Sequence, residues 1–232
     1  LPKISGVINQ VEVDQGMNWM FVLADQRLLH VINLNNENLE QTVTLDNVGV
    51  ITSLDMLLGE NSLLIGTSTG QVSQWFMARK DGKWRLQQVR SFEMQHGEVK
   101  SISTEQRRKG FFVSSVDGYV AIFHSTAHRT LFNEKLVDSE IINLTISPRA
   151  KDLLIETADG KINHFRVDND HPEISWSSMW DEVWYEGYED ATYTWQSSSS
   201  SSDFEPKYSL VPLVFGTLKG AFYAMMLAAP LA

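Results

Sequence analysis

The sequence predicts an all-β chain, in which a partial β-propeller of about four four-stranded blades precedes a linker and the start of a transmembrane helix. One strand–turn–strand pattern occurs four times within residues 1–172. The composition then changes to aromatic, acidic and serine residues over residues 173–209. The last segment, residues 210–232, is an apolar run whose only charge is Lys219. These three observations define the propeller, the linker and the membrane segment.

The repeat combines an apolar strand, a tight turn and a second strand in which polar and apolar residues alternate. Its copies span residues 21–34, 63–77, 111–125 and 153–167. Measured from the second turn residue, they lie 44, 48 and 42 residues apart, close to the roughly 40–45 residues of a four-stranded propeller blade. Further strand-like segments precede each copy and follow most copies. They are residues 6–13, 48–56, 98–104 and 140–146 before the hairpins, and 39–45, 84–92 and 129–136 after them.

The turns of these hairpins contain residues that favour positive φ. Asp-Gly pairs occur at 117–118 and 159–160, and a weaker Thr-Gly pair occurs at 69–70. The first copy has the degenerate pair Asp-Gln at 25–26. Asp-Gly is the favoured sequence of a two-residue hairpin loop, so we expect such loops here.

Residues 139–167 resemble a repeat of the WD type. They contain an apolar strand, a Ser-Pro turn, a small-residue strand, an Asp-Gly turn and a closing strand. Residues 95–99 resemble a displaced form of the Gly-His element that opens such a blade. The Trp-Asp dipeptide is missing, and Trp75 and Phe165 are the nearest aromatic substitutes. The resemblance therefore implies WD-like architecture rather than any particular member of that superfamily.

The number of predicted blades is small for a closed ring. Propellers have typically four to eight blades, and WD-like propellers usually have about seven. Either further blades lie upstream or the ring is open. An open ring exposes strand edges, and we expect such edges to pair with other chain segments or with a second copy.

Aromatic residues are concentrated just before the apolar run. Four of the seven tryptophans lie in this segment, at Trp176, Trp180, Trp184 and Trp195. Aromatic residues with a polar tip collect where apolar and wet surroundings meet. The sequence favours a belt at a membrane interface, with packing on the blades as the alternative. The serine run that follows is typical of a flexible linker.

The apolar run is long enough to cross a membrane. Its 23 residues, 210–232, exceed the length that a bilayer core of about 30 Å requires. The alternative, a buried core helix, predicts a polar face and capping residues at both ends. A charge at the bilayer centre costs about 2.5–3.5 kcal/mol, so we expect Lys219 to face other helices or water.

The last fifty residues or so strongly resemble one junction in a known transporter family. The motifs are WYEGY at 184–188, WQSSSS at 195–200, FEPK at 204–207 and FGTLK at 215–219. They are similar to the long-form permease subunit of bacterial phosphate ABC transporters, where an extracytoplasmic insert meets the transport core. The resemblance implies a set of membrane-junction residues, namely Trp184, Tyr185, Trp195, Phe204, Pro206, Gly216 and Lys219.

This resemblance also implies a location and partners. The propeller would face the periplasm at the bacterial inner membrane and contribute to phosphate uptake, with docking of the phosphate-binding protein as one role. Its partners would be the second permease subunit, the ATPase subunit and the periplasmic phosphate-binding protein, and no transport site would lie in this chain. One alternative is a membrane-anchored propeller scaffold that binds other envelope proteins. A propeller enzyme or ligand sensor ranks last.

Composition excludes several other functions. The formal net charge of −10 argues against nucleic acid as a partner, because no positive field attracts the phosphate backbone. Cysteine is absent, which removes disulfides, thiolate metal sites and a cysteine nucleophile. No P-loop, dinucleotide or nucleophile-elbow motif occurs. We therefore expect no enzyme activity and no cofactor.

Two clusters nevertheless contain residue types that bind ligands. His124 and His128 are four residues apart but span the end of a predicted strand, so no metal site is expected. The basic run Arg107, Arg108 and Lys109 would attract phosphate, but its place between two predicted strands favours a solvated turn.

Overall fold

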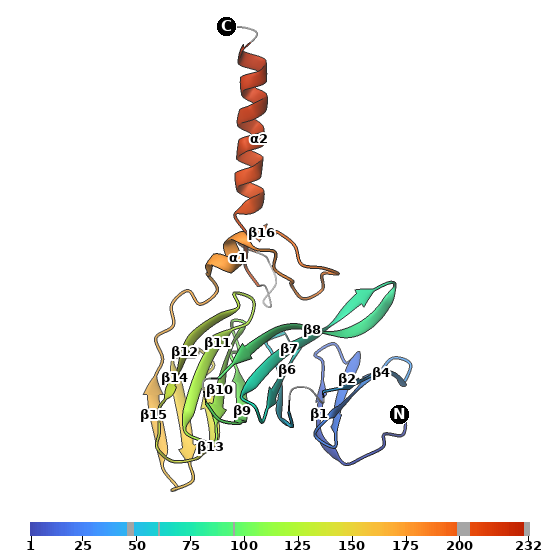
Figure 1. Ribbon diagram of the computed structural model, residues 1–232, viewed down its shortest axis with the longest axis vertical. Coiled ribbons are helices and arrows are strands. Elements are labelled where there is room, and N and C mark those ends of the chain that lie inside the picture. The colour runs from blue at the N-terminus through green and yellow to red at the C-terminus, as the bar shows by residue number, and fades with distance from the viewer. Residues whose placement is uncertain (46–48, 60, 95, 199–204, 230–232) are drawn as a thin grey trace.

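The computed structural model describes residues 1–45, 49–59, 61–94, 96–198 and 205–229, and it confirms an all-β partial propeller followed by a helix (Figure 1). Blade 1 contains β1 (Ile8–Val13), β2 (Trp19–Ala24), β3 (Leu28–Asn33) and β4 (Asn38–Thr44). Blade 2 contains β5 (Ile51–Met56), β6 (Ser62–Thr67), β7 (Gln71–Lys80) and β8 (Lys83–Glu93). Blade 3 contains β9 (Val99–Thr104), β10 (Gly110–Ser115), β11 (Tyr119–His124) and β12 (Arg129–Lys135). Blade 4 contains β13 (Ile141–Ile146), β14 (Asp152–Thr157) and β15 (Ile162–Arg166).

Each blade is an antiparallel meander whose strands pair in chain order. The predicted two-residue loops are wrong: Thr67 and Gln71 flank three residues, 68–70, and the other blades have loops of the same length. The reason is that a type I turn uses two residues before a left-handed glycine, here Gly118 with φ of 90°. A Cβ at Gly118 would lie 2.0 Å from the carbonyl oxygen of Val137, so only glycine fits this turn.

A separate apolar core fills each of the three gaps between neighbouring blades. Fully buried members are Phe21 and Leu63 between blades 1 and 2, Phe111 and Phe123 between blades 2 and 3, and Leu153 and Ile155 between blades 3 and 4. Burying each such side chain contributes about 1.5–3 kcal/mol. The blades therefore stack as a single continuous body.

The four blades form an open row, because blades 1 and 4 lie at its opposite ends (Figure 1). Blade 4 has three strands, and the expected open edge lies at β15. Both end blades expose apolar side chains, including Ile8, which is 53% exposed, and Ile162, which is 73% exposed. Within the described residues, blades 1 to 3 each have the four predicted strands.

The segment after the propeller folds into short elements before a long helix. It contains α1 (Trp176–Trp180), a two-stranded ribbon of β16 (Trp195–Gln196) and β17 (Lys207–Tyr208), and then α2 (Val211–Ala228). Ser175 caps α1 in a capping box. Helix α2 has the apolar N-cap Leu210 and a proline, Pro212, in its first turn, and it projects away from the blades with no buried side chain (Figure 1). It is the one helix among the described residues that is long and apolar enough to span a membrane.

Candidate functional site

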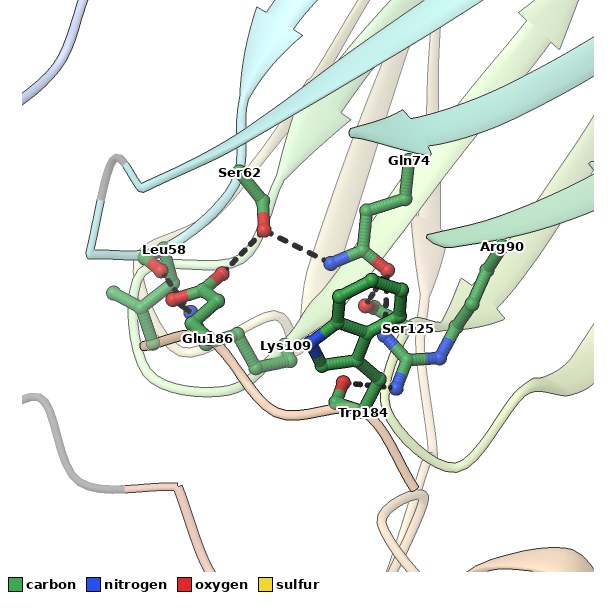
Figure 2. Close-up of polar contacts among 8 residues, drawn as sticks. All are labelled: Leu58, Ser62, Gln74, Arg90, Lys109, Ser125, Trp184 and Glu186. Atoms are coloured by element: carbon green, nitrogen blue, oxygen red, sulfur yellow. Dashed lines mark hydrogen bonds and ion pairs between the residues drawn. The ribbon is translucent and has the colours of Figure 1, made fainter. Parts of the chain in front are cut away.

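A buried group of polar side chains joins blades 2 and 3 to the segment that precedes α2 (Figure 2). We call this group the polar clamp. It consists of Ser62, Gln74, Arg90, Lys109, Ser125, Glu186, and the backbone carbonyls of Leu58 and Trp184. Its members come from the strands and loops of two blades and from the loop after α1. The polar clamp therefore fixes the position of this loop relative to the propeller.

The first half of the polar clamp is an ion pair between the propeller and the loop. The Nζ atom of Lys109 lies 2.7 Å from Oε2 of Glu186, and it also donates to the carbonyl oxygen of Leu58. The hydroxyl of Ser62 donates to Oε1 of Glu186. Lys109 is only 5% exposed. A buried charge needs both an opposite charge and hydrogen bonds, and these contacts supply them.

The second half is built around Arg90 and Gln74. The guanidinium of Arg90 donates to Oε1 of Gln74 at 3.0 Å and to the carbonyl oxygen of Trp184 at 2.7 Å. The Gln74 amide donates to Ser62 at 2.9 Å, and its oxygen also accepts from Ser125 at 2.7 Å. Gln74 thus connects the two halves. Burial lowers the pKa of Arg90, and the charges of nearby carboxylates oppose this shift.

Aromatic packing surrounds the polar clamp. The Trp184 ring meets Phe76 of blade 2 edge to face at 5.6 Å, and its indole N–H donates to the carbonyl oxygen of Tyr188. Tyr185 is 2% exposed, and burial raises its pKa to about 12. Lys207 lies 5.3 Å from the centre of the Tyr185 ring. Trp184 therefore packs on blade 2, whereas Tyr185 is buried with Tyr188 and Lys207 of its own segment around its ring.

Glu205 lies beside the polar clamp on the return segment toward α2. Burial raises its pKa to about 7, while the charges of Lys109 and Arg90 oppose the shift. Its Oε1 atom has no hydrogen-bond partner among the described residues. A cavity of about 190 Å³ separates Glu205 and Pro206 from the β9–β10 loop, and His124 also lines it. The Glu205 carboxyl is therefore a buried group that faces the same cavity as the β9–β10 loop.

The other predicted junction residues lie farther from the propeller. Trp195 is 40% exposed and contacts Tyr208 across the β16–β17 ribbon at 5.9 Å. Gly216 and Lys219 are exposed on α2, where the Lys219 ammonium lies 5.9 Å from the centre of the Tyr223 ring. Phe204 lies outside the described residues. The structure thus places Trp184, Tyr185 and Pro206 in the segments beside the polar clamp, and it places Trp195, Gly216 and Lys219 away from it.

The histidines and the basic run differ in their surroundings. Burial lowers the pKa of His124 to about 3, and its Nδ1 accepts from the backbone N–H of Ala127. Among the described residues, no group of three or more His, Asp or Glu side chains could hold a metal ion. The expectation of a solvated turn is wrong for Lys109, because the Glu186 carboxylate holds its charge inside the protein. Of the same run, Arg108 pairs with Glu105 and only Arg107 is exposed.

Sequence analysis did not identify the other clamp residues. Ser62 begins β6, Gln74 lies in β7 next to a second polar residue, Ser73, and Glu186 is one of several acids in its segment. A polar side chain at a buried strand position needs a partner, so Gln74 is the residue that a strand pattern can detect. Its partners remain unknown without the tertiary structure.

The chain has the fold of a WD-like partial β-propeller. No protein-family model matches it. It is 21% identical over 158 residues to the WD repeat-containing protein 55 homologs of Drosophila persimilis and Drosophila pseudoobscura pseudoobscura, a match that covers 68% of this chain and 30% of each relative. The chain thus spans less than a third of the length of these curated relatives.

Solved structures give the same fold. Kluyveromyces lactis Hsv2p is similar with a TM-score of 0.57 and 13% identity, over 73% of this chain and 52% of that chain. The β-propeller domain of Cps50 (Swd1) from Myceliophteria thermophila is similar with a TM-score of 0.58 and 11% identity, over 69% of this chain and 51% of that chain. At these identities the similarity establishes the architecture alone.

Proposed function

We propose that this chain is a non-catalytic, extracytoplasmic part of the permease subunit of a bacterial phosphate ABC importer. In this proposal the propeller lies on the periplasmic side of the inner membrane and α2 enters the bilayer. The single observation that supports it most is the polar clamp. It ties the blades to the loop at Trp184 and Glu186, within the segment that resembles the phosphate permease junction.

The character of α2 supports a membrane location. Its 18 residues correspond to about 27 Å at 1.5 Å per residue, close to a bilayer core of about 30 Å. Large apolar side chains such as Phe215, Leu218 and Leu227 are each at least 65% exposed. A soluble helix would cover such a surface with a core, whereas lipid or neighbouring permease helices satisfy it directly.

The polar clamp gives the propeller a defined role in this proposal. Because the blades cannot swing freely about the junction, they present a fixed surface above the permease mouth. A fixed surface suits docking of the periplasmic phosphate-binding protein, since no loop has to be ordered on binding. The second permease subunit and the ATPase would bind the membrane domain rather than the propeller.

The test uses the full-length permease assembled with its second subunit and ATPase in nanodiscs. Phosphate-binding protein, loaded or empty, is titrated onto this complex by calorimetry, with free phosphate as the control. We expect binding that depends on loading and that is lost when the propeller is removed. Equal binding with and without the propeller would contradict the docking role, and absence of phosphate uptake in cells would contradict the transporter assignment.

A second candidate is a membrane-anchored scaffold for other envelope proteins. It rests on the similarity to WD-repeat propellers and on the exposed edge at β15. In cells that lack their own phosphate permease, the full-length protein would then fail to restore uptake of radioactive phosphate. Cross-linking from the propeller would instead identify envelope proteins whose capture does not change with phosphate supply.

A further inference from the structure

A second polar site lies at the ends of blades 3 and 4, on the β9–β10 loop that also bears Lys109. It is an open hollow of about 890 Å³. Five basic residues line it, and we call it the cationic hollow: Arg107, Arg108, Arg149, Lys151 and Arg166. We infer that the cationic hollow binds phosphate-type anions, either free orthophosphate or a phosphate group on a larger molecule.

The charge of the cationic hollow is opposite to that of the chain. The chain has a formal net charge of −10, yet five cationic side chains meet here. Three carboxylates also line the hollow, those of Asp152, Asp168 and Asp170. Asp152 already contacts Nε2 of His164 at 2.9 Å. The cations therefore outnumber the acids. Asp152, which lies opposite Arg166 on the neighbouring strand, already has His164 as a partner.

Most of these cations have no ion-pair partner among the residues that the structure describes. Arg108 pairs with Glu105 at 2.8 Å. The side chains of Arg107, Arg149, Lys151 and Arg166 make no ion pair with any residue that the structure describes, and all four are exposed. Where cations outnumber the carboxylates near them, their mutual repulsion raises the free energy of the folded protein, and a bound anion lowers it.

The walls of the cationic hollow are held in place. Arg108 also donates to the carbonyl oxygen of Asn169 at 2.8 Å, which ties the β9–β10 loop to the segment after β15. The hydroxyl of Ser147 accepts from the backbone N–H groups of Lys151 and Asp152, which fixes the β13–β14 loop. The site is therefore largely formed before a ligand arrives, so little loop entropy is lost on binding.

The types of cation point to phosphate. A guanidinium donates two parallel hydrogen bonds to neighbouring phosphate oxygens, and four of the five cations are arginines. A hollow of about 890 Å³ exceeds the volume of a single orthophosphate, so it also accommodates a phosphate group on a larger molecule. The inference does not depend on the proposed function, because it uses only the residues of the cationic hollow.

The test compares two double variants of the full-length protein in nanodiscs. Arg149→Gln with Lys151→Gln removes two exposed cations from the cationic hollow. Lys80→Gln with Lys83→Gln removes two exposed cations from the tip of the β7–β8 hairpin and serves as the control. Binding of orthophosphate and of glycerol 3-phosphate is measured by calorimetry and by ³¹P NMR, each at two salt concentrations. We expect the hollow variant to bind at least about tenfold more weakly and the control within twofold of the original protein.

A lipid arm separates the two sources of phosphate. The full-length protein is placed in nanodiscs of phosphatidylcholine alone and in nanodiscs that also contain anionic lipid. Cross-linking to lipid from position 149 is then compared between the two. Soluble phosphates that bind equally in both nanodiscs identify free phosphate as the ligand. Cross-linking to anionic lipid with no binding of soluble phosphates identifies a headgroup. Equal affinity of the hollow variant and the original protein in every arm would overturn the inference.

Discussion

The polar clamp and the cationic hollow share the β9–β10 loop but differ in how their positive charges are neutralised. Lys109 and Arg107 are two residues apart on one loop, yet Lys109 is buried against Glu186 while Arg107 remains exposed. The difference is the segment after α1, which covers one end of the loop and brings a carboxylate with it. A cation that the chain itself neutralises stabilises the fold, whereas an uncovered cation is available to a ligand. Changes at these residues and at their neighbours test this contrast.

The largest effect is expected from breaking the buried ion pair. Lys109→Met leaves the Glu186 carboxylate without its opposite charge, which costs about 3–5 kcal/mol of the free energy of unfolding. Chemical denaturation followed by tryptophan fluorescence measures this loss, since Trp184 lies in the same region. The control Lys83→Met, on an exposed turn, should change the free energy by less than about 0.5 kcal/mol.

A companion variant distinguishes charge from packing. Replacing both partners, Lys109→Met with Glu186→Leu, removes the isolated charge and should recover part of the lost free energy. If the double variant is less stable than the single one by the full cost of a second deletion, the two side chains are not coupled and the polar clamp is misassigned.

The next effect is a dependence of stability on pH. Glu205 has a pKa of about 7 in the folded protein, above the 4.5 of a free side chain, so the folded state binds more protons between these values. The contribution of Glu205 to the free energy of unfolding therefore falls as pH rises from about 5 to 8. Glu205→Gln should flatten this decline. An unchanged slope in the variant would show that Glu205 does not titrate in this range.

His124 acts in the opposite direction. Its pKa of about 3 in the folded protein lies below the 6.5 of a free imidazole, so the unfolded state binds more protons between these values. The stability that this histidine contributes is therefore lost as pH falls below about 6.5. The variant His124→Asn should lose this dependence of the free energy of unfolding on pH below about 6.5, as measured by chemical denaturation at several pH values.

A smaller loss is expected at the residue that links the halves of the polar clamp. Gln74→Leu removes the acceptor of Arg90 and Ser125 and the donor to Ser62, which costs about 1–3 kcal/mol. Gln88→Leu, at an exposed position of β8, is the control and should have little effect. Hydrogen exchange should show increased opening of the loop at Trp184 in the first variant only. Equal exchange in both would contradict a linking role.

The smallest effect on folding is expected in the cationic hollow. Arg149→Gln with Lys151→Gln should change the free energy of unfolding by less than about 0.5 kcal/mol, because neither side chain has a described partner. In phosphate buffer the original protein should gain thermal stability over a non-binding buffer of equal ionic strength, and the variant should not. A large loss of stability in the variant would assign these side chains to the fold rather than to a ligand.

The sequence by itself determined the blades. Strand alternation, the turn residues and the spacing of the repeat can be read from the sequence, and they predicted the hairpin at the centre of each blade, although not the β16–β17 ribbon. The predicted loop length of two residues was wrong because Asp-Gly occurs both in two-residue loops and in three-residue loops. The pairing register of the two strands decides which loop forms. The long apolar helix was likewise visible in composition alone.

Only the tertiary structure decided the two sites. Ser62 and Glu186 are 124 positions apart in sequence, and no local pattern relates a serine in a strand to an acid in a distant loop. The same holds for the basic run, where the folded segment after α1 buried Lys109 and left Arg107 uncovered. Local propensity fixes strands and turns, whereas burial of a charge depends on which remote segment covers it.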